Sequence, residues 1–133
     1  MGAFGGVLER LSVHDSAVEV GVGERPELAV ALAERGLDVT VTDVHERSVP
    51  APVTFVRDDV TRPTLEIYDG ADVIYARNLP PELQRPVAAL ARTVDAECCF
   101  TTLGGDPATV PVTTEALDDE PLYVARRGGP DLE

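Results

Sequence analysis

The sequence predicts an α/β fold built on one doubly wound, mainly parallel sheet. Short apolar runs rich in β-branched residues alternate with helix-like segments along the 133 residues, which is typical of βαβ units. Glycines follow the first apolar run, and acidic residues end the second and third. From these observations we predict the strand order 3-2-1-4-5, with Gly21 and Asp43 adjacent at the carboxyl edge. The length indicates a single domain over 1–133, with 127–133 expected to be a flexible tail.

The expected strands are short and apolar, and several are dominated by β-branched residues, which fit a pleated sheet. They cover residues 17–22, 39–44, 53–56, 72–76 and 97–103. Residues 110–113 and 122–125 are expected to form a late strand or a hairpin.

The expected helices lie between these strands. A short helix includes residues 7–11. A second helix begins at Pro26, because the missing N–H of proline costs nothing in a first turn, and ends at Gly36, which is placed to cap it. Residues 61–70 leave room for a short helix, and another helix is expected from about Pro86 to Val94.

The charge balance excludes several classes of partner. The chain has 24 acidic residues against 11 arginines and no lysine, for a net charge of -13. Such a surface repels phosphates and anionic lipid, so general nucleic-acid binding is not expected. No apolar run approaches the roughly 20 residues of a membrane span, and the N-terminus does not have the pattern of a signal peptide. We therefore expect a cytoplasmic protein.

The cysteines and histidines do not predict a metal site. Cys98 and Cys99 are adjacent, so in a strand they would point to opposite faces and act as small buried hydrophobes. His14 and His45 do not have the spacing of metal ligands.

The stretch EVGVG contains the first candidate binding residues. Gly21 and Gly23 follow the first strand and precede a helix, which is the context of a nucleotide-binding loop. Asp43 ends the second strand 20 residues after Gly23, where a carboxylate can accept hydrogen bonds from both hydroxyls of a ribose. Asp59 ends the third strand and could accept a hydrogen bond from an adenine amino group, with Val60 packing on the ring.

The loop departs from the dinucleotide pattern, because Pro26 stands where a third glycine is expected. A diphosphate therefore fits less well than S-adenosylmethionine, which carries an amino acid and a positive sulfonium. The carboxylate of Glu19, at the start of the loop, suits such a ligand, although it could instead pair with an arginine.

The motifs EVGVG, TDV, RDDV and DVIYARN, over residues 17–102, resemble those of class I S-adenosylmethionine-dependent methyltransferases. The whole chain resembles a small archaeal UPF-type family of uncharacterised proteins with a Rossmann-like, methyltransferase-like fold, and its acidic, lysine-free composition resembles proteins of halophiles. The resemblance implies that Glu19, Gly21 and Gly23 form the glycine loop. It also implies that Asp43 binds ribose, and that Asp59 and Val60 contact adenine.

Three further features qualify this resemblance. Asn78 follows Arg77 at the end of the fourth strand and is either a turn residue or a weak catalytic candidate, because its N-x-P-P context is similar to an Asn-Pro-Pro motif. Arg25 stands at another expected glycine position and would block or re-aim the methionine end. About thirty residues follow the fifth strand, so the fold is expected to be truncated relative to full methyltransferases.

The expected function is binding of S-adenosylmethionine, either by a small methyltransferase with an unknown acceptor or by a degenerate relative that still binds the cofactor. The alternative is a non-enzymatic module that binds a nucleotide or a protein partner. An NAD-binding oxidoreductase is disfavoured by Pro26 and by the lack of a substrate domain. The sequence leaves the acceptor and the oligomeric state open.

Overall fold

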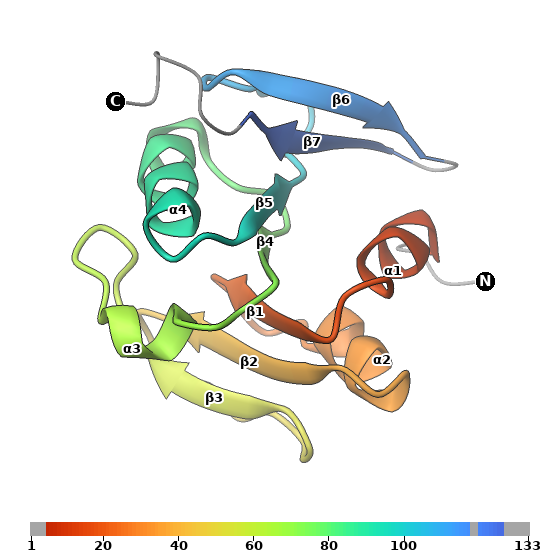
Figure 1. Cartoon of the computed structure of the whole chain (residues 1–133), viewed down its shortest axis with the longest axis vertical. Helices are drawn as coiled ribbons and strands as arrows, with labels where there is room; N and C mark the ends of the chain where they lie inside the picture. Colours follow the sequence, from red (N-terminus) through yellow and green to blue (C-terminus); the bar gives the residue numbers. More distant parts are fainter. Residues whose placement is uncertain (1–4, 118–119, 127–133) are drawn as a thin grey trace.

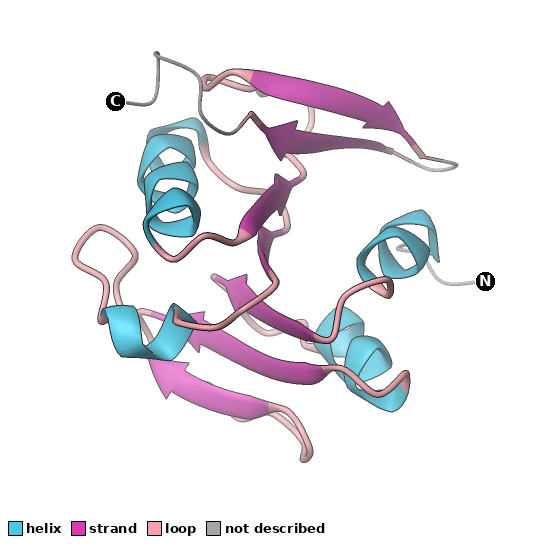
Figure 2. Ribbon diagram, viewed as in Figure 1, coloured by secondary structure: helices cyan, strands magenta, loops and turns pink. Residues whose placement is uncertain are grey.

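The protein forms a seven-stranded sheet in the order β3-β2-β1-β4-β5-β7-β6, seen in Figures 1 and 2. The computed structural model describes residues 5–117 and 120–126, so the predicted tail at 127–133 lies outside the described residues. The strands are β1 Ser16–Val20, β2 Asp38–Asp43, β3 Thr54–Arg57, β4 Val73–Ala76, β5 Glu97–Phe100, β6 Val112–Ala116 and β7 Pro121–Ala125. Strands β1 to β5 are parallel, and β7 is antiparallel to β5 and β6. The predicted order 3-2-1-4-5 and the late hairpin are confirmed.

Helices cover both faces of the sheet (Figure 1). They are α1 Gly5–Leu11, α2 Glu27–Glu34, α3 Leu65–Tyr68 and α4 Pro81–Thr93. The helices α1 and α2 bury apolar side chains in one core cluster with Val39 and Val41. The helices α3 and α4 contribute to a second cluster with Ile74. The central strands are therefore buried on both faces, as in a doubly wound fold, and their apolar side chains point into both clusters.

The two cysteines show this two-sided burial directly. Cys98 belongs to the α3–α4 cluster and Cys99 to the α1–α2 cluster, and both are free thiols. Burial raises the pKa of Cys98 to about 12, so this thiol stays protonated and unreactive at neutral pH. The prediction that both act as small buried hydrophobes is confirmed.

The end of α2 was predicted correctly. Gly36 has a φ of +98°, a conformation that glycine adopts without steric cost. The N–H of Gly36 donates to the Ala33 carbonyl and the N–H of Leu37 donates to the Leu32 carbonyl. These two bonds form a Schellman motif, which satisfies carbonyls at the end of the helix.

The predicted start of α4, near Pro86, was wrong. The helix begins at Pro81, where a proline at the first position is already set to the helical φ. Pro86 lies inside the helix and removes one backbone donor. The buried side chains of Val87 and Leu90 keep the helix packed on the sheet despite this loss.

The predicted first and fifth strands are shorter than expected. β1 ends at Val20 because Gly21 turns with a φ of +71°. β5 ends at Phe100, since the Thr101 carbonyl accepts the N–H of Leu79 and the Thr101 Oγ1 accepts the N–H of Asn78. These bonds tie the chain leaving β5 to the chain leaving β4.

The connection from β5 to β6, residues 101–111, contains no helix in the described chain. It is held instead by Gln84 on α4, a fully buried side chain. The Gln84 Nε2 donates to the Pro107 carbonyl, and its Oε1 accepts the N–H of Thr109. The chain therefore passes from β5 to β6 through a loop and not through a helix. Among the described helices, none is long and apolar enough to cross a membrane.

Candidate functional site

A cleft opens at the carboxyl ends of β1 and β4, where the strand order reverses. Ligands of open α/β sheets bind at this kind of position. The cleft has a volume of about 320 Å³ and is lined by residues of the β1–α2 loop and of the end of β4: Glu19, Gly21, Val22, Gly23, Glu24, Arg25, Arg77 and Asn78. Four predicted site residues, Glu19, Gly21, Gly23 and Asn78, are thus brought together.

The glycine loop is anchored to β2 through its backbone. The N–H groups of Gly21 and Val22 donate to the Thr42 carbonyl at 2.8 and 3.1 Å. The N–H of Gly23 donates to the Asp43 Oδ2 at 2.8 Å, and Gly23 has a φ of +60°. Gly21 and Asp43 therefore share the carboxyl edge of the sheet, as predicted.

Asp43 is buried and negatively charged. Its side chain is 8% exposed, and its Oδ1 accepts the N–H of His45 at 3.0 Å. Burial disfavours the ionised form, but the bonds from His45 and Gly23 and the charge of Arg47 outweigh it, so the pKa of Asp43 is lowered. A full negative charge is therefore present at neutral pH, next to the glycine loop.

Arg47 is a site residue that the sequence reasoning missed. Its Nε lies 3.4 Å from the Asp43 Oδ2, and its Nη1 lies 3.6 Å from the Glu24 Oε2. The Nε is buried without a hydrogen-bond partner among the described residues. Arg47 thus links the β2–β3 connection to the glycine loop. The sequence offered no local signal for this pair, because a spacing of four residues brings side chains together in a helix and residues 44–47 are not helical.

Glu19 lies at the floor of the cleft and is 1% exposed. The hydroxyl of Tyr75, on the neighbouring strand β4, donates to its Oε1 at 2.8 Å. Burial raises the pKa of Glu19 to about 7, although the Tyr75 bond and the positive charge of Arg77 act in the opposite direction. The hydrogen-bond partner of Glu19 is thus Tyr75 and not an arginine. Arg77 lines the same cleft, and its positive charge acts on the carboxyl group.

Asp59 and Val60 lie at the end of β3 and do not line the cleft. The Asp59 Oδ1 accepts the N–H and the hydroxyl of Thr61 at 2.9 and 2.7 Å, and this hydroxyl bond lowers the pKa of Asp59. Val60 is buried in the core. The neighbouring Asp58 donates its N–H to the Asp43 carbonyl, so these residues border the Asp43 strand end.

Asn78 is exposed in a left-handed conformation with a φ of +55°. Its N–H donates to the Thr101 Oγ1 at 2.9 Å. The residue therefore makes the turn that leaves β4, while its side chain stays available at the cleft.

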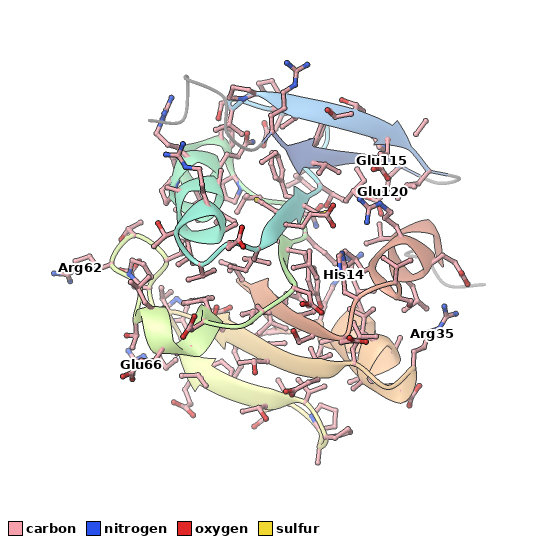
Figure 3. All side chains as sticks on the ribbon, in the orientation of Figure 1. His14, Arg35, Arg62, Glu66, Glu115 and Glu120 are labelled. Atoms are coloured by element: carbon pink, nitrogen blue, oxygen red, sulfur yellow. The ribbon has the colours of Figure 1, made fainter. Side chains whose placement is uncertain are left out.

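Another titratable cluster, away from the cleft, belongs to the packing of α1. Arg10 contacts Glu97 and Glu115 at 2.9 and 2.8 Å, and the His14 Nε2 lies 2.9 Å from the Glu97 Oε1; His14 and Glu115 are labelled in Figure 3. Within the described part of the chain, no group of three His, Cys, Asp or Glu side chains could hold a metal ion.

Comparison with known proteins places the chain in a family. The model of an uncharacterised protein family (UPF0146) matches residues 1–124. The chain belongs to this family. A UPF0146 protein of Halobacterium salinarum is 51% identical over 117 residues, covering 87% of this chain and 91% of that relative. A UPF0146 protein of Archaeoglobus fulgidus is 46% identical over 89 residues, covering 67% of this chain and 68% of the relative.

Solved structures with a similar fold include several methyltransferases, and also a putative Zn-dependent alcohol dehydrogenase from Rhodobacter sphaeroides with a TM-score of 0.52 at 19% identity, covering 71% of this chain and 43% of its own. An O-methyltransferase family protein from Burkholderia thailandensis has a TM-score of 0.60 at 11% identity, covering 96% of this chain and 57% of its own. A TehB-like SAM-dependent methyltransferase from Corynebacterium glutamicum has a TM-score of 0.60 at 14% identity, and the match covers 90% of this chain and 85% of that protein. The N-terminal domain of EvdMO1 with SAH bound has a TM-score of 0.60 at 15% identity, covering 93% and 66%. At these identities the likeness shows a Rossmann-like fold that this chain shares with these proteins, and nothing finer.

Proposed function

We propose that this UPF0146 protein binds S-adenosylmethionine in the cleft and transfers its methyl group to an acceptor that the site does not identify. The observation that carries this proposal is the ionised carboxylate of Asp43, which does not itself line the cleft but accepts the N–H of Gly23, a residue that does. A carboxylate in this position can accept hydrogen bonds from two ribose hydroxyls.

The charges of the cleft suit the amino-acid end of the ligand. Glu19 supplies a carboxyl group for a cationic centre, while Arg25 and Arg77 line the same cleft and can attract a carboxylate. A diphosphate is disfavoured, because Pro26 at the start of α2 has no N–H to offer and because Glu24 also lines the cleft. The balance supports a zwitterionic ligand over NAD.

The adenine end of the ligand is assigned to the β3 side of Asp43. Asp59 follows Asp58, whose N–H is bonded to the Asp43 carbonyl, so Asp59 is close enough in the fold to be a candidate for the adenine amino group. Val60 would contribute only its small exposed edge, since it is 8% exposed.

Methyl transfer demands little of the side chains around the acceptor. The sulfonium is already a strong electrophile, so holding the acceptor in line with the methyl group can supply much of the rate. Asn78 and Arg77, at the end of β4, are our candidates for contacts with the acceptor.

A binding module without catalysis is the second candidate. The 101–111 connection carries no helix among the described residues, so this connection supplies no helix that could enclose an acceptor.

The two candidates are separated by measuring binding and transfer in turn. Thermal shift and calorimetry in molar KCl would use S-adenosylmethionine, S-adenosylhomocysteine and NAD, with Asp43→Asn as the matched variant. We expect the first two ligands, and not NAD, to stabilise the protein. Methyl-labelled S-adenosylmethionine with haloarchaeal cell extract then tests transfer, and binding without label incorporation would favour the second candidate. No binding at millimolar ligand would contradict the cofactor proposal and would favour a module that binds a protein partner.

A further inference from the structure

The floor of the cleft holds a carboxyl group that has almost no contact with bulk water. Glu19 is 1% exposed and yet lines the cleft. It extends from β1, and the phenol of Tyr75 on β4 donates to its Oε1. Tyr75 is itself 2% exposed, so the pair is fixed between two central strands and meets a ligand from one side.

We infer that Glu19 holds a proton in the empty cleft and releases it to solvent when the ammonium group of the ligand binds against it. The inference rests on the proposed function and deepens it. In the empty protein the buried carboxyl group keeps its proton, because burial penalises the charged form. When the cation enters, the O–H bond of Glu19 breaks, the proton passes to buffer, and a carboxylate–ammonium pair remains.

The charged groups around Glu19 are compatible with this switch. From β4 it faces Tyr75 and Arg77, and from α2 the charge of Glu27 acts on it. Glu24 and Arg25 of the glycine loop line the same cleft. The negative charge of Glu27 helps to keep Glu19 protonated, while Arg77 limits how far its pKa rises above the ordinary range. The pKa of Glu19 therefore lies near neutral pH, and one added cation is enough to shift the carboxyl group to its ionised form.

The number of protons released follows from the pKa of Glu19. With a pKa of about 7, Glu19 is about three-quarters protonated at pH 6.5. An opposite charge at contact distance lowers the pKa of a carboxyl by about 1 to 3. Binding at pH 6.5 should then release about half to three-quarters of a proton.

The test is calorimetric titration of the full chain with S-adenosylmethionine at pH 6.5 in molar KCl, in two buffers of different ionisation enthalpy. The difference in observed enthalpy gives the number of protons released. We expect wild type to release about half a proton or more beyond Glu19→Gln, because the titration of the ligand is common to both proteins and cancels. Glu66→Gln, which changes an exposed carboxylate of α3 outside the cleft lining, should release as much as wild type.

Two further arms test the geometry. Tyr75→Phe removes a donor that favours the ionised form, so the release should persist to higher pH than in wild type; an unchanged pH profile would contradict the role of the pair. S-adenosylhomocysteine, which keeps the ammonium, should release the proton, and methylthioadenosine, which lacks the amino-acid end, should not. Binding of S-adenosylmethionine with equal release in wild type and Glu19→Gln would overturn the inference and leave the proposed function standing. Absence of binding would overturn both.

Discussion

The substitution Glu19→Gln should make the protein more stable at alkaline pH while leaving it little changed at pH 4.5. Glutamine has nearly the same shape, and its carbonyl oxygen can still accept the hydroxyl of Tyr75, which donates to Glu19 at 2.8 Å. The change therefore removes an ionisable group and keeps the packing around it.

The sign and size of the effect follow from the raised pKa. Glu19 moves from 4.5 in an unfolded chain to about 7 in the folded protein. The folded state therefore holds one more proton between these two values, and the free energy of unfolding falls as pH rises through that window. A difference of about 2.5 in pKa corresponds to about 3 kcal/mol, complete above pH 7. Since domains of this size are stable by roughly 5–15 kcal/mol, the effect is large enough to measure.

The assay is urea unfolding of wild type and Glu19→Gln from pH 4.5 to 8.5 at constant molar KCl. Urea is uncharged, so the salt that screens the acidic surface stays fixed. Other titrating groups are common to both proteins and cancel in the difference. We expect the variant to gain stability over wild type progressively with pH, up to about 3 kcal/mol. Parallel curves across the whole range would refute the claim that Glu19 is buried in its protonated form.

Three other predictions concern the site, the α1 contacts and the surface. Asp43→Asn should weaken binding of S-adenosylmethionine on the order of tenfold to a hundredfold, because hydrogen bonds to a charged acceptor are worth about 1.5–3 kcal/mol; calorimetry showing unchanged affinity would count against ribose binding there. Arg10→Ala leaves Glu97 and Glu115 without their guanidinium partner and should cost about 1–3 kcal/mol at pH 7 in urea unfolding. Burial opposes ionisation of Glu97, but Arg10 and His14 lower its pKa overall, so this stabilisation is present above about pH 4.5 and the variant should approach wild type as pH falls further. The net charge of -13 should make the melting temperature rise from dilute buffer to molar KCl, followed by circular dichroism, and a salt-independent melting temperature would contradict self-repulsion.

The features that the sequence predicted well are local ones. The β-branched runs of β2 and β4, the capping glycine at Gly36 and the strand-end position of Asp43 each depend on a few neighbouring residues. The approach of Gly23 to Asp43 was predictable as well, because parallel strands joined by a short helix bring the loop after β1 beside the end of β2.

The features that sequence reasoning missed depend on tertiary contacts, either between strands or between connections and helices. The bond from Tyr75 to Glu19 requires the register in which these two residues pair between β1 and β4, and a shift of one residue would turn the phenol to the other face. The ion pair of Arg47 depends on how the β2–β3 connection folds back, and Gln84 reaches a loop that lies 23–25 residues further along the chain. The start of α4 was misplaced because two prolines competed as helix starts, and packing on the sheet decided between them.

A crystal structure of the complex with S-adenosylhomocysteine, grown in molar KCl, tests the central claim most directly. The account predicts one ligand per chain at the carboxyl edge of the sheet. Its ribose hydroxyls should lie within hydrogen-bond distance of the Asp43 carboxylate, and its ammonium should lie against Glu19. A ligand bound elsewhere, or one whose ribose does not contact Asp43, would contradict the account.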